Sequence, residues 1–134
     1  MPIFFNRVLR GKPGNPDSEK KWYLILKSVG LIRTNKVARL LADETTLNHK
    51  EAEVALVQAG KIMGRLLSDG HTVDLEGLGS FFVTANSTAS DTKEGVSSRN
   101  VKSLNIRFTP CKELKQAVAE SSLKPADSIG LNSE

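Results

Sequence analysis

The sequence predicts an α+β fold: two helices, then a three-stranded sheet that extends into a long polar hairpin arm, with a separate strand pair at the N-terminus. Three observations support this prediction. Apolar residues recur at helical spacing between residues 49 and 67. Residues 72–84 and 102–108 alternate between apolar and polar side chains, which is typical of strands. Residues 86–100 contain few apolar side chains, cannot be buried in a core, and are expected to form the exposed arm.

The length of 134 residues and the hydrophobic content of 39% suit a single folding unit with one modest core. Within it we distinguish an N-terminal β extension over residues 1–30, a main domain over 31–122 and a flexible tail over 123–134. The tail is assigned because the residues after Pro125 show no sustained period.

The N-terminal extension is interpreted as a strand pair. Residues 3–10 and 21–29 are rich in aromatic and branched side chains, and residues 11–18 between them are rich in glycine, proline, asparagine and aspartate. A short helix over residues 20–29 is the alternative, because lysine, leucine and tryptophan tolerate one.

Two helices are predicted next. Thr34 is positioned to cap the first, which ends near Asp43. Asn48 and Glu51 have the spacing of a capping box before the second, and Gly70 stands where a left-handed C-terminal cap requires a residue without Cβ. The second helix has an apolar stripe from residue 52 to residue 67 and further valines at 54 and 57 off that stripe. A helix that is apolar on two sides suggests contact with a partner chain, hence a dimer.

The sheet is expected to begin with a strand at residues 72–75, a turn at 76–79 and a returning strand at 80–84. Residues 93–95 are the expected tip of the arm, and residues 102–108 form the third strand with Leu104, Ile106 and Phe108 on one face. Thr109 and Pro110 are expected to cap and begin a closing helix. Its inward side would consist of Leu114, Ala117 and Val118.

Composition excludes several classes of function. The single cysteine cannot form an internal disulfide, and with only two histidines beside it no zinc cluster is expected. No nucleophile or acid–base spacing suggests an enzyme, so no catalytic residue, metal, cofactor or small-molecule substrate is assigned. No stretch is long enough to span a bilayer, and the N-terminus does not resemble a signal peptide, so we expect a cytoplasmic protein without a membrane partner.

The net charge of +4 suits a polyanionic partner without identifying one. The excess of positive charge lies in residues 1–50, which contain ten Lys and Arg residues and four Asp and Glu residues. Residues 51–134 contain nine Lys and Arg residues and eleven Asp and Glu residues.

Two motifs resemble the HU and IHF family of bacterial histone-like proteins. Residues 77–81, Gly-Leu-Gly-Ser-Phe, are similar to the family's Gly-Phe-Gly-Ser/Thr-Phe, and residues 108–115, Phe-Thr-Pro-Cys-Lys-Glu-Leu-Lys, are similar to its Phe-Lys-Pro-Gly-Lys-x-Leu-Lys. The resemblance covers residues 31–119 and follows the family's order of elements. It implies an HU-like intertwined homodimer with two β-ribbon arms, double-stranded DNA as the partner, and nucleoid organisation as the role.

The resemblance also implies which residues contact DNA. Gly77, Gly79 and Ser80 would bring backbone N–H groups and a hydroxyl to a phosphate, although a plain tight turn explains them equally well. Lys112 and Lys115 match the family lysines that contact the DNA backbone, with a merely solvated face as the alternative. Four further cations lie in the arm, of which Arg99 and Lys102 are favoured: Lys93, Arg99, Lys102 and Arg107.

Three departures from the family weaken the expected bending. The tip lacks the family's proline wedge, and Val96 is its only apolar candidate, so kinking by intercalation is not expected. Asp91 and Glu94 would repel phosphates and make binding through the arm modest. Thr109 and Cys111 replace the family's lysine and glycine beside the closing helix.

The first 30 residues lie outside the ordinary family plan but are similar to the extension of larger histone-like proteins from Bacteroides and its relatives. They contain six cations and two acids. This charge could supply a second DNA-facing surface, or could protect an edge strand from aggregation. The aromatic residues Phe4, Phe5, Trp22 and Tyr23 are interpreted as packing residues rather than base-stacking platforms. A protein-interaction or structural module that has lost DNA bending is the alternative function for the whole chain.

Overall fold

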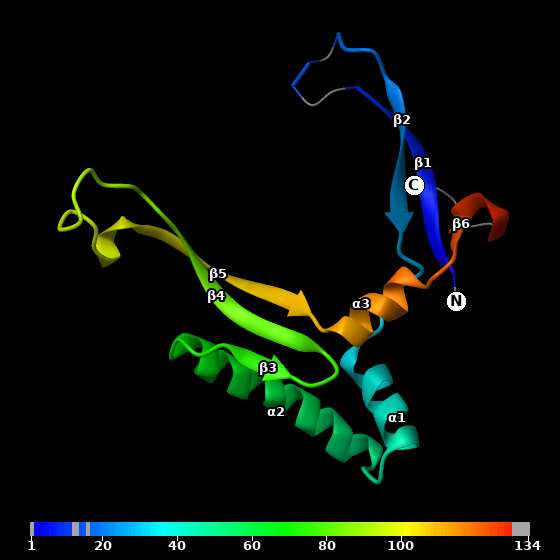
Figure 1. The fold of residues 1–134 in the computed structure, drawn as a ribbon. Coiled ribbons are helices and arrows are strands. Elements are labelled where there is room, and N and C mark those ends of the chain that lie inside the picture. Colours follow the sequence, from blue (N-terminus) through cyan, green and yellow to red (C-terminus); the bar gives the residue numbers. More distant parts are fainter. Residues whose placement is uncertain (1, 12–13, 16, 130–134) are drawn as a thin grey trace. The chain divides into compact units, whose positions relative to one another are not determined.

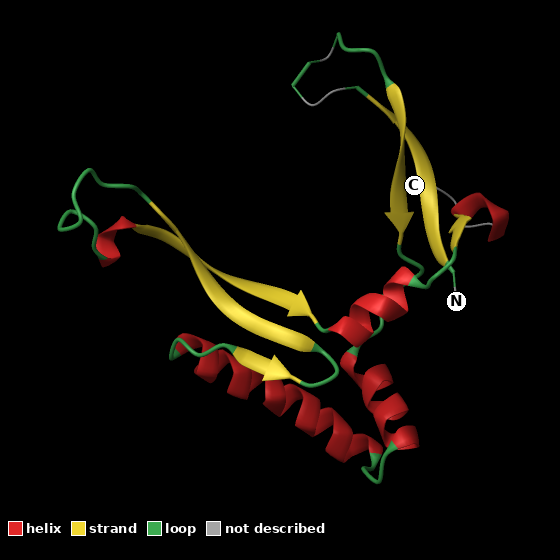
Figure 2. Cartoon of the chain, in the orientation of Figure 1, coloured by secondary structure: helices red, strands yellow, loops and turns green. Residues whose placement is uncertain are grey.

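The computed structural model describes residues 2–11, 14–15 and 17–129. Figures 1 and 2 show its helices and strands. The chain divides into two compact units, one formed by residues 1–32 and 117–134 and the other by residues 33–116. The expectation of a single folding unit stays a prediction, because two compact units in one chain can fold together. The N-terminal strands gain their partner from the C-terminal end of the chain and not from the main sheet.

The first unit is a three-stranded sheet in the order β2-β1-β6. Strand β1 (Ile3–Arg10) pairs antiparallel with β2 (Lys21–Lys27), and the short β6 (Leu123–Pro125) runs parallel to β1. The strand pair is thus confirmed over its described residues, and the alternative of a helix over residues 20–29 is excluded.

The predicted flexible tail is wrong for residues 123–129, which form β6 and the short 3-10 helix η2 (Ala126–Ile129). Ile3 N–H donates to the carbonyl oxygen of Ser122 over 2.7 Å, and Ala126 is fully buried. The sequence pattern missed this strand because three residues are too few to show a period. The remainder of the predicted tail, residues 130–134, lies outside the described residues.

The second unit begins with two helices, α1 (Thr34–Glu44) and α2 (His49–Ser68). Helix α1 begins one residue earlier than a Thr34 cap would imply, because Arg33 occupies the N-cap and makes no side-chain capping bond. The cap of α2 is as predicted: Glu51 N–H donates to Asn48 Oδ1 over 2.8 Å. Gly70 has φ +87°, the left-handed conformation predicted for the residue that ends the helix.

The second sheet has the order β3-β4-β5, with all pairs antiparallel. Its strands are β3 (Val73–Leu75), β4 (Gly79–Ser87) and β5 (Val101–Pro110). Strands β4 and β5 continue well beyond the short β3, and Figure 1 shows them as a long hairpin with a loop at its far end. The predicted arm is therefore present, and we use this term for residues 82–107.

The start of the closing helix differs from the prediction. Thr109 and Pro110 remain in β5, opposite Ser80 and Gly79, and α3 (Lys112–Ala119) begins two residues later than expected. The ladder of β4 and β5 continues to Gly79, so Cys111 takes the position before the helix. None of the residues of α3, including the predicted inward residues, is buried in the single chain.

The single chain has a very small core. Among the described residues, the buried apolar side chains are those of Ala38, Ala52, Leu67 and Ala126, and no large side chain is fully buried. None of the helices in the described segments combines the length and hydropathy that crossing a bilayer requires.

Candidate nucleic-acid interface

The turn between β3 and β4 is hydrogen-bonded to the beginning of α3. Cys111 N–H donates to the carbonyl oxygen of Leu78 over 2.9 Å, and Leu78 N–H donates to the carbonyl oxygen of Leu75 over 3.0 Å. The two motifs that support the family resemblance are therefore neighbours in space. We call residues 76–78 together with Lys112 and Lys115 the turn-helix surface.

The two glycines of the turn have different roles. Gly79 is buried with φ +146°, and a Cβ built there would collide with the Thr109 carbonyl oxygen and lie 2.9 Å from Pro110 Cα. Gly77 has φ +85°, is exposed, and has open space where a Cβ would be. Gly79 thus allows two strands to approach closely, whereas Gly77 leaves its main chain accessible to a ligand.

Ser80 uses its hydroxyl hydrogen within the protein. Its Oγ donates to Asp74 Oδ1 over 3.0 Å, from β4 to the adjacent strand β3. A hydroxyl that donates to a carboxylate is not free to donate to a phosphate, and the carboxylate itself repels one. Asp74 was not identified by the sequence analysis, because its proximity to Ser80 depends on the register of two strands.

Lys112 and Lys115 are three residues apart in α3 and therefore lie on neighbouring positions of one helix face. Both are exposed. The helix begins after Cys111, whose carbonyl oxygen accepts from Lys115 N–H at 3.1 Å and whose Sγ accepts from Leu114 N–H at 3.4 Å. The lysines thus add two positive charges near the end of a helix that already favours anions.

The four predicted arm cations come from different elements of the arm. Arg107 pairs with Phe82 on the polar face of the hairpin, opposite to the face that contains Leu104 and Ile106. Arg99 lies in the short 3-10 helix η1 (Ser98–Asn100), and Lys93 lies in the loop at the tip. All four side chains are exposed.

Lys102 lies at a β-bulge. Ser87 pairs with Val101 and Asn86 pairs with Ser103, so Lys102 between them has no partner across the ladder. A bulge changes the direction of the side chain and bends the strand. No pattern in the sequence indicated this irregularity, because an apolar–polar alternation does not reveal which strand contains the extra residue.

The loop of the arm is closed by its own hydrogen bonds. Thr88 N–H donates to the Asn100 carbonyl oxygen over 2.8 Å, and Asn100 Nδ2 donates to Thr88 Oγ1 over 3.0 Å. Ser97 N–H donates to Asn100 Oδ1 over 2.8 Å. Val96 is 54% exposed, and the turn from Thr92 to Gly95 falls at the predicted tip.

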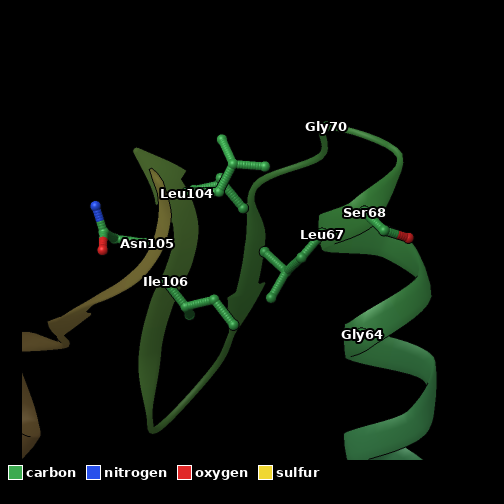
Figure 3. A pocket seen from close by; sticks show the side chains of 8 residues that line it. Gly64, Leu67, Ser68, Gly70, Leu104, Asn105 and Ile106 are labelled. Carbon is green, nitrogen blue, oxygen red and sulfur yellow. The ribbon is translucent and has the colours of Figure 1, made fainter. Parts of the chain in front are cut away.

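An apolar groove separates the end of α2 from the β4–β5 hairpin. It has a volume of about 480 Å³, and Figure 3 shows Leu67 of α2 pointing toward the strands. Leu104 and Ile106 on the facing strand are 71% and 67% exposed. Such side chains are normally covered in a folded protein. The groove is lined by Gly64, Leu67, Ser68, Gly70, Val83, Leu104, Asn105 and Ile106.

Comparison with models of known protein families identifies a related family. The family model HU-HIG, described as an HU domain fused to wHTH, Ig, or Glycine-rich motif, matches residues 1–125. No curated protein sequence matches the chain.

Two solved structures are similar in fold. A crystal structure from Bacteroides vulgatus, described as "Putative bacterial DNA binding protein", has a TM-score of 0.62 and 14% identity over 92% of this chain. The match covers 47% of that protein, so the chain spans about half of its length. The HU protein of Anabaena, crystallised with DNA, has a TM-score of 0.50 and 20% identity over 66% of this chain and 99% of its own.

Proposed function

Since this chain belongs to the HU-HIG family, we propose that it binds duplex DNA without strong sequence preference, through contacts with the phosphate backbone. The two structural relatives support this proposal by their descriptions, one as a DNA-binding protein and one as a DNA cocrystal. A cytoplasmic role in organising the nucleoid follows from it, with binding rather than catalysis as the activity.

The observation that carries the proposal is the hydrogen bond between Cys111 N–H and the Leu78 carbonyl oxygen. It joins the exposed Gly77 main chain to the two lysines of α3. A phosphate on the turn-helix surface would meet an accessible main chain, a helix N-terminus and two ammonium groups, while the carboxylates of Glu76 and Glu113 would oppose it. Gly79 and Ser80 are proposed to shape this surface, since one is buried and the other already donates to Asp74.

The arm is proposed as a weaker second contact. Lys93, Arg99, Lys102 and Arg107 provide positive charge, while Asp91 and Glu94 at the tip oppose it. Because the tip contains no proline and its loop is closed by the bonds between Thr88 and Asn100, we propose backbone contact with weak or no kinking.

We also propose that the chain is a homodimer. Much of the exposed apolar surface lies along the groove and on α2, where Val54 and Val57 are 66% and 50% exposed. A second chain that covers these side chains would complete a core that the single chain lacks.

Salt-titrated fluorescence anisotropy on a labelled duplex of mixed sequence tests the proposal. We expect binding at low salt that weakens steeply as salt rises, with a logarithmic slope of about 0.9 for each phosphate contacted. Two unrelated duplexes should give similar affinities. Absence of binding at micromolar protein and low salt would refute the proposal.

One observation favours a second candidate, a protein-interaction module on the same scaffold. Trp22, Leu24 and Leu26 lie on one face of β2 and are 70%, 52% and 60% exposed. An apolar sheet face of this kind suits a protein partner. If the anisotropy experiment shows no DNA binding while the chain is folded, this function replaces the first.

A further inference from the structure

The N-terminal sheet has two chemically different faces. Side chains alternate along each strand, and paired residues of adjacent strands point to the same side. The register of β1 with β2 and β6 therefore assigns every residue of the three strands to a face. One face includes Leu9, Trp22, Leu24 and Leu26, together with Arg7. The other, which we call the cationic face, has Arg10, Lys21, Lys27 and Lys124 at its two ends and the apolar residues Val8 and Ile25 between them.

The four cations form two like-charged groups. Arg10 lies directly opposite Lys21, and at the other end of the sheet Lys27 and Lys124 lie on either side of Phe4. Like charges placed opposite each other destabilise a sheet. The sequences of β1, β2 and β6 contain no Asp or Glu, and in the described part of the chain none of these four residues forms an ion pair. The cost of this repulsion would be offset by a bound polyanion.

Protection of an edge strand accounts for charge at these positions but does not require four cations to share one face. Lys21 and Lys27 are on the edge strand β2, where charge discourages aggregation. Arg10 is at the end of β1, beyond Ile3–Phe5 where this strand pairs with β6, so β1 is also an edge there. The other cation of β1, Arg7, points to the opposite face and lies over the Phe5 ring, 5.5 Å from its centroid.

We propose that the cationic face is a second surface for duplex DNA, separate from the turn-helix surface, and that it binds phosphates on both sides of a groove. Lys21 and Lys27 are six residues apart, a span of about 20 Å in a strand. This exceeds the roughly 12 Å width of the major groove of B-DNA. Tyr23 and Asn6, which lie between the two charged ends on the same face, can donate hydrogen bonds to the same backbone.

The inference rests on the proposed function for the identity of its ligand, so the experiment must separate the two. Salt-titrated anisotropy on one labelled duplex compares the wild-type chain with two variants of the sheet. Arg10→Gln with Lys21→Gln removes two charges from the cationic face. The matched control, Arg7→Gln with Lys20→Gln, removes two charges from the same unit, since Arg7 lies on the other face and Lys20 precedes β2.

The expected result is a fall in the affinity of the Arg10/Lys21 variant of about 5- to 50-fold at moderate salt. Its salt slope should fall by about 1 for each phosphate that the variant no longer neutralises. The control should keep the wild-type slope. If the wild-type chain binds DNA but both variants bind like it, the inference is wrong while the proposed function stands. If the wild-type chain does not bind, both are wrong.

Lysine acetylation of the wild-type chain gives a test that needs no variant. With and without an unlabelled duplex, the modification of each lysine is measured by mass spectrometry. DNA should protect Lys21, Lys27 and Lys124 at low salt, and the protection should disappear at high salt. Equal modification with and without DNA at low salt would overturn the inference.

Discussion

Cys111 N–H and the carbonyl oxygen of Leu78 are 2.9 Å apart, which fixes the turn after β3 against the first turn of α3. Cys111 has a side chain, whereas the HU and IHF family commonly has glycine at this position. The structure accommodates it, because the main chain makes the hydrogen bond and Sγ accepts from Leu114 N–H. The substitution therefore leaves the turn-helix surface assembled.

Replacing Lys112 and Lys115 by glutamine should weaken DNA binding about 10- to 100-fold at moderate salt. The reason is the loss of two cations beside a helix N-terminus, and the salt slope should fall by about 2. The matched control replaces Lys36 and Arg39, two exposed cations of α1, by glutamine. Anisotropy on one duplex measures all three proteins, and an equal loss in both variants would show that only net charge matters.

Gly79 and Gly77 should respond differently to alanine. At Gly79 a Cβ meets the Thr109 carbonyl oxygen, so Gly79→Ala should lower the free energy of unfolding by about 2–5 kcal/mol. At Gly77 only the positive φ disfavours alanine, so Gly77→Ala should lower the free energy of unfolding by about 1 kcal/mol. Urea denaturation at equal protein concentration measures both. Equal losses would contradict the assignment of the close approach to Gly79.

Asp74 should oppose DNA binding, because its carboxylate lies beside the turn and accepts from Ser80 Oγ. Asp74→Asn keeps an oxygen that can accept this hydrogen bond and removes the negative charge. We expect the affinity for duplex DNA to rise about 2- to 5-fold at low salt, with the gain disappearing at high salt. Ser80→Ala should change the affinity little. A large loss in Ser80→Ala would instead identify the hydroxyl as a phosphate ligand.

The parts of the fold that the sequence could predict are those with a local signal. The cap at Asn48 and the left-handed Gly70 each depend on neighbouring residues. Apolar alternation likewise identified the strands β4 and β5. The parallel pairing of Leu123 with Ile3 could not be predicted in this way, because it joins the two ends of the chain through only three residues.

For the candidate interface, sequence motifs suggested candidate residues but not how these residues lie relative to one another. They pointed to Gly77, Gly79 and Ser80 as one group. The register of the strands separates these three, because it buries Gly79 against β5 and places Ser80 beside Asp74. The two cationic groups of the N-terminal sheet likewise become visible only when the register pairs Arg10 with Lys21.

Leu104→Glu should disrupt the proposed dimer. The side chain is 71% exposed in the single chain and lines the groove beside α2, so a partner that covers it would have to bury a charge. Ser103→Glu is the matched control, because Ser103 lies on the other face of the strand, bonded to Asn86. Size-exclusion chromatography with light scattering should give about 29 kDa, twice the chain mass of 14.6 kDa, for the wild-type chain and the control. A wild-type mass of one chain would refute the dimer.

The arm should bind DNA by charge alone, and its two kinds of charge give predictions of opposite sign. Arg99→Gln with Lys102→Gln should lower affinity about 3- to 10-fold, because two cations are removed from η1 and the bulge. Asp91→Asn with Glu94→Gln should raise affinity by a similar factor, because two negative charges are removed from the tip.

Energy transfer across an end-labelled duplex should show little bending in every case, since the tip has no proline wedge. Unchanged affinity in both variants would exclude the arm from the interface, and strong bending by the wild-type chain would contradict contact through the backbone alone.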